Sequence, residues 1–294
     1  YCEAYSSFGI KCIVAPKIPN NEGSLSVIRI SAPEGCILNA VHPAPVATRH
    51  ITGQLLPDVM FGCLAKALDG GVPAEGTSCL WNLFAAGGDS RIEADLEVVA
   101  KTKLFNVQSF HSGGTGARPG KDGLSATAFP SGVKNVPVEI TEALSPLLVT
   151  RKEYRVDSGG PGQFRGGLGQ VIEAIHLDSV PFMISANYDR VDFAPRGRDG
   201  GKSGATGVVR MGSGTRLRGK GQQTIPAGES FVIEQPGGGG LGDPMKRDPA
   251  RVAADVVAGM VSVEAARRDY GVVVSAEGVV DAAATGRLRG RADH

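Results

Sequence analysis

Glycine constrains this chain more than any other residue type. The sequence holds 42 glycines among 294 residues, about twice the fraction of roughly 7% that is usual in proteins. Many stand in dense runs, interleaved with Val, Ile and Phe rather than with linker residues. Because glycine tolerates the backbone angles of tight turns, this pattern predicts many turns between short strands. We therefore expect an α+β fold that is β-rich, with Gly-rich mixed sheets or a sandwich, a few helices and a helical C-terminus.

The charges of the chain nearly cancel. Lys plus Arg number 31 and Asp plus Glu number 30, so no electrostatic attraction toward nucleic acid or an anionic membrane is expected. No apolar run approaches the roughly 18 residues of a membrane span, and the start of the chain does not resemble a signal peptide. We expect a cytoplasmic protein that acts on a small molecule. The chain starts with Tyr1 rather than Met, so we also expect further sequence upstream.

The five cysteines are odd in number and widely spaced, and no two of them form a C-x-x-C pair. This spacing favours reduced thiols over a thiolate zinc site.

The first half of the chain predicts a mixture of strands and helices. Short apolar runs bounded by Pro, Asn and Gly predict strands at 10–14 and 26–30. Apolar residues at helical spacing predict a helix over about 55–69, with Pro57 in its first turn. A short helix is expected at 137–145.

The second half reads as β-structure followed by helices. Alternating side chains at 152–156 and 231–234 predict strands within a β-rich stretch from about 147 to 236. Asp248 before Pro249 predicts the start of one helix, and Ser262 the start of another that ends at Gly271. We expect four regions: mixed α/β structure at 1–146 continuing from a missing N-terminal half, a β-rich region at 147–245, helices at 246–274 and a mobile tail at 275–294.

Two glycine runs admit both a structural and a functional interpretation. In the run 236–244 the backbone could approach a ligand or a partner closely, but a strand-to-helix crossover with positive φ angles is favoured. The run 157–169 is expected to be a folded turn pinned by Asp157 and Arg165. Residues 196–203 are similar to a phosphate-binding loop, yet Arg196 stands where that motif needs glycine, so a surface turn is favoured.

Isolated histidines offer little metal chemistry. His42 and His50 are eight residues apart with no carboxylate or further histidine nearby to complete a metal site. His176 lies within a strand pattern, where a structural histidine is favoured. No metal ligand is therefore assigned in this chain.

The segment 111–123 is the best candidate for a functional site. It places His111, Arg118, Lys121 and Asp122 in one Gly-rich stretch. Backbone N–H groups and short side chains of such loops can converge on an anion or a carbonyl oxygen. The alternative is a structured loop whose charges are solvated.

Eight runs, taken in order, resemble the C-terminal portion of the hydantoinase B / 5-oxoprolinase family, the N-methylhydantoinase B-like subunits that are related to acetone carboxylase alpha-type subunits. One glycine run would be weak evidence, but the order of the runs is specific. The matching stretches are 19–23, 32–35, 39–49, 113–123, 135–148, 157–169, 236–244 and 261–272.

This resemblance implies an ATP-dependent hydrolase that opens cyclic amides such as hydantoins or 5-oxoproline and is active only in a larger assembly. It implies ATP with Mg on a hydantoinase A-like ATPase subunit, and a divalent metal such as Zn or Mn on the N-terminal half of the B polypeptide, present upstream or as a separate chain. The family's metal motifs have no equivalent in this chain. The alternatives are a subunit of an ATP-dependent ketone carboxylase and a non-catalytic scaffold piece.

Within this resemblance, the segment 111–122 is expected to face the active site. The catalytic candidates are His111 and Asp122. The substrate-binding candidates are Gly113, Gly114, Arg118 and Lys121.

Overall fold

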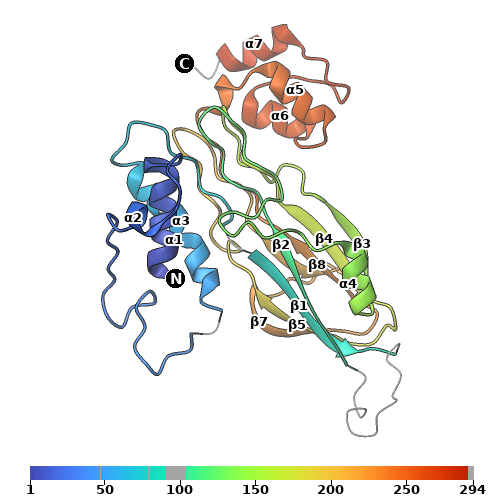
Figure 1. The fold of residues 1–294 in the computed structure, drawn as a ribbon. Coiled ribbons are helices and arrows are strands. Elements are labelled where there is room, and N and C mark those ends of the chain that lie inside the picture. The colour runs from blue at the N-terminus through green and yellow to red at the C-terminus, as the bar shows by residue number, and fades with distance from the viewer. Residues whose placement is uncertain (47, 79, 91–103, 291–294) are drawn as a thin grey trace, which may run out of the picture.

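A computed structural model describes residues 1–46, 48–78, 80–90 and 104–290 of the chain. A β-sandwich and a bundle of extended segments form the centre of the molecule (Figure 1). N-terminal helices lie at one side of the bundle, and C-terminal helices cover the end that is farthest from the sheets.

The sandwich consists of two four-stranded antiparallel sheets with a shared apolar core. The first sheet has the order β2 (Leu104–Ser112), β1 (Leu80–Gly88), β5 (Phe182–Asn187) and β7 (Lys220–Ile225). The second has the order β3 (Leu147–Tyr154), β4 (Gln170–His176), β8 (Ser230–Glu234) and β6 (Val208–Met211). The expected β-rich sandwich is therefore confirmed. Strands from both sides of residue 147 share the first sheet, because β1 pairs with β5.

Most of the dense glycine runs form the bundle rather than turns between strands. Six extended stretches without helix or sheet assignment lie together there, and their backbones are hydrogen-bonded to one another. The stretch 235–242 bonds to five others, namely 73–78, 113–118, 158–165, 166–169 and 195–206. It is therefore the central segment of the bundle.

Several hydrogen bonds of the central segment recur after three residues. The N–H groups of Gly237 and Gly240 bond to the same neighbouring segment, and consecutive residues from Gly237 to Gly240 bond to different ones. The N–H groups of Gly237, Gly238, Gly239 and Gly240 donate in turn to the carbonyl oxygens of Ala205, Gly167, Glu75 and Lys202. The carbonyl groups follow the same rule, since Pro236 and Gly239 accept from Gly114 and Ala117. Three residues per turn is the periodicity of the polyproline II helix, here surrounded by neighbouring backbones.

This packing explains the glycines and corrects the expected crossover. Within the run 236–244, only Gly242 has a positive φ, of 73°. A Cβ atom on Gly238 would overlap the carbonyl group of Thr115, and one on Gly239 would overlap that of Arg196. These residues are glycine because other backbones occupy the space of a side chain, as at the crowded axis of collagen. The close backbone approach that the run 236–244 suggested is therefore an approach to other segments of the same chain.

The N-terminal region differs most from the sequence-based expectation. The predicted strand at 10–14 is wrong, because these residues belong to helix α1 (Cys2–Val14). Residues 26–30 are not a strand either, and follow the short helix α2 (Glu22–Leu25). Helix α1 packs on α3 (His50–Leu64), where a Cβ on Gly9 would lie 2.8 Å from the Cα of Pro57. Pro57 is thus inside α3 instead of in its first turn.

The helices that follow β2 in the sequence form close to where local sequence signals predicted them. Helix α4 (Val138–Leu144) is found where a short helix was expected. After the 3-10 turn η1 (Pro244–Lys246), the side chains of Asp248 and Ser262 cap α5 (Pro249–Val257) and α6 (Val263–Tyr270). Gly271 ends α6 with a φ of 62°. Residues 282–290, expected within a mobile tail, form helix α7 (Ala282–Gly290); the last four residues lie outside the described part.

The close packing of the bundle predicts how glycine substitutions change the free energy of unfolding. Gly238→Ala places a methyl group on the carbonyl of Thr115, and a backbone held by hydrogen bonds on several sides cannot move away. We expect a loss of at least about 3 kcal/mol in the free energy of unfolding, or no folded protein. The matched control is Gly62→Ala in α3, where a Cβ meets nothing within 4 Å. It should be neutral or stabilising by up to about 1 kcal/mol in urea unfolding followed by circular dichroism. Equal effects of the two substitutions would contradict this packing.

Candidate functional site

The segment 111–123 is not a single loop. His111 lies near the end of β2, and residues 113–117 form one segment of the bundle. The chain reverses at Arg118 to Lys121, whose backbones exchange hydrogen bonds of 2.9 and 3.0 Å. Pro119 and Gly120, with φ 78°, occupy the centre of this turn, as in a type II turn. Asp122 follows the turn, so one bundle segment separates it from His111.

His111 is buried at the edge of the sandwich. Its Nε2 lies 2.8 Å from the Oγ of Ser109, and its Nδ1 has no hydrogen-bond partner among the described residues. A narrow cavity, lined also by Thr141 and Lys152, lies beside the ring. Burial, helped by the charge of Lys152, lowers the pKa of His111 to about 3. The imidazole is therefore neutral near pH 7, and its predicted catalytic role stays a prediction.

The substrate-binding candidates occupy two different settings. A Cβ on Gly114 would overlap the carbonyl of Gly167, and one on Gly113 would lie 2.5 Å from the carbonyl oxygen of Pro236. These two glycines are therefore packed inside the bundle. Arg118 donates from Nη2 to the carbonyl oxygen of Asp122 at 3.0 Å, and Lys121 is exposed at the turn. Their predicted binding roles likewise stay predictions.

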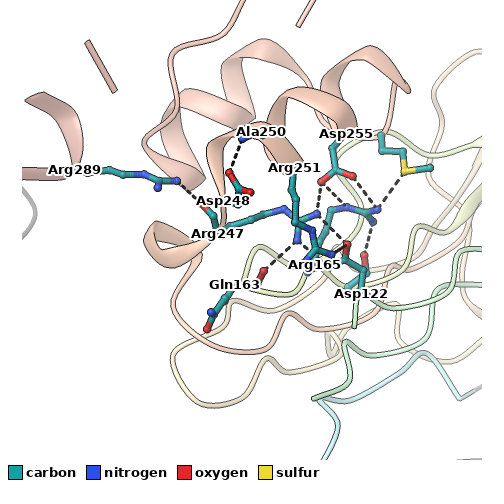
Figure 2. Close-up of polar contacts among 11 residues, drawn as sticks. Asp122, Gln163, Arg165, Arg247, Asp248, Ala250, Arg251, Asp255 and Arg289 are labelled. Atoms are coloured by element: carbon teal, nitrogen blue, oxygen red, sulfur yellow. Dashed lines mark hydrogen bonds and ion pairs between the residues drawn. The ribbon is translucent and has the colours of Figure 1, made fainter. Parts of the chain in front are cut away.

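Asp122 belongs to an ionic cluster that joins the bundle to the C-terminal helices (Figure 2). Arg247, whose side chain is 1% exposed, donates to Asp122 at 2.7 and 3.0 Å and to Asp255 at 2.7 Å. Arg165 reaches Asp255 at 3.3 Å, and Arg251 reaches Asp122 at 2.7 Å. Three guanidinium groups thus share two carboxylates. Because Arg247 follows η1 and Asp255 lies on α5, the cluster fixes the C-terminal helices on the bundle.

The electrostatics of Asp122 fit a structural role. Burial acts to raise its pKa, but the hydrogen bonds and charge of Arg247, the backbone N–H of Arg165 and the charge of Arg251 hold the pKa below its ordinary value. A carboxylate kept ionised by several cations is a poor proton donor near pH 7. The expected turn pinned by Asp157 and Arg165 is found in altered form. Asp157 accepts from the backbone N–H of Ser262 at 2.8 Å, so each of the two binds the C-terminal region and they do not bind one another.

A second ionic cluster joins α3 to the same bundle. Arg190 donates to Asp58 at 3.2 Å and to Glu75 at 3.1 Å, and Arg196 donates through Nε to Glu75 at 2.7 Å. The Oγ of Ser78 donates to Asp58 at 2.5 Å. Burial raises the pKa of Asp58 to about 6, against the lowering effects of Ser78 and Arg190. Burial also acts to raise the pKa of Glu75, but the hydrogen bonds of Arg196 outweigh it and lower that pKa.

Sequence reasoning missed both clusters. Arg247 and Asp122 are 125 residues apart, and Arg190 and Asp58 are 132 apart. No local motif links such positions. The one available signal was that Glu75, Asp122 and Arg165 each precede a glycine, which does not identify their partners.

A cavity of about 660 Å³ lies between α3, the segment 35–48 and the ends of β5 and β7, within the usual size range of small-molecule sites. Its polar wall is built around Lys220, whose Nζ lies 2.7 Å from Asp189 and 3.2 Å from the Oδ1 of Asn187. On another wall the Arg49 guanidinium lies 4.9 Å from the centre of the Tyr1 ring. Cationic and amide groups can bind a carboxylate or a polarised carbonyl in such a cavity.

The described residues do not fit a nucleotide or metal site. In the loop 196–203, the N–H groups of Gly201 and Lys202 donate to the carbonyl oxygens of Arg198 and Pro161. They are therefore not free to bind phosphate. In the part of the chain that the structure describes, no group of three or more His, Cys, Asp or Glu residues could hold a metal ion. None of its helices is long and apolar enough to cross a membrane.

Comparisons with known proteins place the chain in a family. The model of the hydantoinase B/oxoprolinase family matches residues 1–244, and the chain belongs to this family. Caprolactamase subunit beta of Pseudomonas jessenii is 32% identical over 91% of this chain and 47% of its own length. An uncharacterized protein of Methanocaldococcus jannaschii is 34% identical over 98% of this chain and 49% of its own length. The chain thus spans about half the length of these relatives.

Solved structures agree with this assignment. The crystal structure of the ATP-dependent caprolactamase from Pseudomonas jessenii superposes with a TM-score of 0.77 at 26% identity, over 98% of this chain and 50% of the other. The nucleotide-free structure of acetone carboxylase superposes with a TM-score of 0.72 at 20% identity, over 99% and 44%. The second likeness concerns the fold alone.

The ionic cluster at the C-terminal helices predicts unequal effects of two arginines. Arg247→Met leaves Asp122 and Asp255 without their buried cation, and we expect the free energy of unfolding to fall by about 3–5 kcal/mol. Arg251→Met removes a second donor to Asp122, but the Arg251 side chain is 43% exposed and should cost less than about 1 kcal/mol. Urea unfolding at pH 7 compares the two variants. Similar losses would contradict a buried cluster centred on Arg247.

The buried imidazole predicts a pH dependence. The pKa of His111 is about 3 in the folded chain, against an ordinary 6.5, so unfolding takes up a proton between these values. The free energy of unfolding therefore falls as pH drops below about 6.5. His111→Gln should remove this contribution, which amounts to about 2 kcal/mol between pH 7 and 5. Denaturant unfolding at both pH values measures it, with exposed His42→Gln as the control. An unchanged pH dependence in His111→Gln would refute the burial of a neutral imidazole.

Proposed function

We propose that this chain is part of the B subunit of an ATP-dependent amidohydrolase that opens cyclic amides of the hydantoin or 5-oxoproline type. The observation that carries the proposal is the likeness to the ATP-dependent caprolactamase, which extends over 98% of this chain. The family match over residues 1–244 and the relation to caprolactamase subunit beta support the same reaction class.

The chemistry explains why such an enzyme would need several parts. An amide carbonyl is a weak electrophile because of resonance with its nitrogen, so activation by ATP makes hydrolysis feasible. We assign ATP and Mg to a hydantoinase A-like ATPase subunit. We assign a divalent metal such as Zn or Mn to the part of the family polypeptide that this chain does not match. With these assignments the proposed enzyme works only as a larger assembly, which we place in the cytoplasm.

Two places in this chain are candidates for contact with the substrate. The cavity beside α3 combines a suitable volume with the converging polar groups of Lys220, Asp189 and Asn187. The turn with Arg118 and Lys121 presents cationic groups at the other end of the bundle. The cavity is the better supported of the two, because it encloses space for a ring and the turn does not.

A ketone carboxylase of the acetone or acetophenone type is the second candidate. The likeness to acetone carboxylase over 99% of the chain favours it, although only at the level of the fold. A scaffold role is the third, and it is supported by the structural contacts of His111 and Asp122.

The assembled complex tests the function directly. ATP hydrolysis is measured in the presence of hydantoin, 5-oxoproline or caprolactam, with and without bicarbonate. We expect one of these rings to stimulate ADP release and to be opened without bicarbonate. A requirement for bicarbonate, with incorporation of labelled carbonate into a ketone, would replace the hydrolase by the carboxylase. Stimulation by none of the rings would refute the hydrolase.

Substitution of two lysines distinguishes between the two candidate substrate contacts. Lys220→Met removes one of the two cations that line the cavity and should raise the KM for the ring substrate by about tenfold, the effect of roughly 1.4 kcal/mol of binding energy. Lys121→Met, at the exposed turn, should leave KM unchanged. The reverse result would move the substrate contact from the cavity to the turn.

A further inference from the structure

Residues 12–46 form an ordered segment without a core of its own. All of them are described, and none is buried. Local hydrogen bonds nevertheless fix the path of the segment. Lys11 donates from Nζ to the carbonyl oxygen of Pro19 and to the Oγ of Ser24, both at 2.7 Å. The side chain of Asn21 accepts from the backbone N–H of Ser24 at 2.8 Å and so caps α2. We call residues 12–46 the uncovered segment.

Many apolar side chains of the uncovered segment are exposed to solvent. Val27 and Ile37 are each 81% exposed. Other large apolar residues in the segment are exposed as well, namely Val14, Ile18, Leu38, Val41 and Val46. Single exposed apolar residues are normal on a protein surface, but several large ones within one short segment that has no buried residue indicate an interface.

Helix α1 likewise buries small and polar residues and exposes an apolar one. It buries Ser6, Ser7, Gly9 and Lys11, whereas Val14 at its end is 65% exposed. An isolated surface helix does the opposite and buries its apolar side. Two hollows of about 820 and 410 Å³ lie along α1 and the uncovered segment, with Phe8 in the wall of both. The small and polar side of α1 packs on α3, whereas Phe8 and Ile10 are only half-buried. The Phe8 ring also lies 5.9 Å from that of Phe129.

The free-energy cost of ordering the uncovered segment implies that another part of the protein covers it. Ordering the backbone costs about 1–2 kcal/mol per residue, and the uncovered segment buries no residue in return. The charges of the segment are Lys17, Glu22, Arg29 and Glu34, two of each sign. A neutral, apolar surface is typical of permanent interfaces, which resemble a domain core cut in half.

We propose that the uncovered segment packs against the half of the hydantoinase B family polypeptide that this chain does not match, whether that half is joined to it or separate. The relatives contain as much sequence again beyond the matched part, since the chain covers 47–50% of the caprolactamase polypeptide. A body of that size can cover the segment and both hollows. The choice of this partner rests on the proposed function, because the family defines the partner.

Site-specific photo-cross-linking tests the surface in the native complex. A photoreactive phenylalanine replaces Ile37, and the matched control replaces Val279, which is 70% exposed near the C-terminal helices. The complex is purified through a tag at the C-terminus. We expect Ile37, and not Val279, to cross-link to peptides of the unmatched half of the family polypeptide, identified by mass spectrometry. Cross-links to a second copy of this chain or to the ATPase subunit, or none, would overturn the proposal.

A substitution in the same surface provides a second readout. The second experiment uses the unmatched half as a separate chain. Val27→Lys combined with Ile37→Lys places two charges in the proposed interface and should reduce the recovery of that half by about tenfold or more. Val279→Lys should leave recovery unchanged. The circular dichroism spectrum of the isolated double variant checks its folding, since both side chains are solvent-exposed there. Full recovery with the folded double variant would contradict the interface.

Turnover of the cyclic amide by the complex without substitutions separates the two proposals, because Ile37 also lines the cavity beside α3. Ring opening together with cross-links to another partner would remove only the interface. The expected cross-links in a complex that opens no ring would remove only the proposed reaction.

Discussion

The structure depends on backbones that approach one another where no side chain fits. In the central segment 235–242, N–H and carbonyl groups bond to five different neighbouring segments. The absence of Cβ atoms at Gly237 to Gly240 makes that approach possible. The sandwich, the N-terminal helices and the C-terminal helices are all attached to this bundle. A high glycine content, which in a loop would only add conformational entropy to the unfolded state, here allows dense hydrogen bonding.

The N-terminal and C-terminal helices are both attached to the bundle through clusters of arginines and carboxylates. Arg190 and Arg196 hold Asp58 and Glu75 at the side of α3, and Arg247 holds Asp122 and Asp255 at the side of α5 (Figure 2). The bundle has few side chains that could form an apolar contact with a helix, so arginines with planar, multiply bonding heads make the connection. In this family member, clustered charges between distant segments therefore indicate contacts that hold the fold together rather than a catalytic site.

The sequence predicted the parts of the fold that local rules determine. The caps at Asp248 and Ser262 and the left-handed Gly271 depend on residues within one turn. Strand β8 was found where alternating residue types predicted it, although Phe231, Val232 and Ile233 are all buried. Residues 10–14 of helix α1 were taken for a strand because they form a short apolar run before turn residues, whereas the packing of the helix at Gly9 is a tertiary contact. The candidate site failed to converge for the same reason. His111 and Asp122 are close in sequence, but a bundle segment runs between them, and their partners come from distant parts of the chain.

The bundle also has a spectroscopic consequence. Its segments are neither helix nor sheet, so far-ultraviolet circular dichroism would count them with unstructured chain, and a content estimate from such a spectrum would describe the centre of this molecule as disordered. Amide hydrogen exchange reports on hydrogen bonding and burial instead. The N–H groups of Gly238, Gly239 and Gly240 are bonded and buried, so their protons should persist as long as those of the central strands. In this protein, the residue type most often associated with flexibility marks the slowest-exchanging backbone.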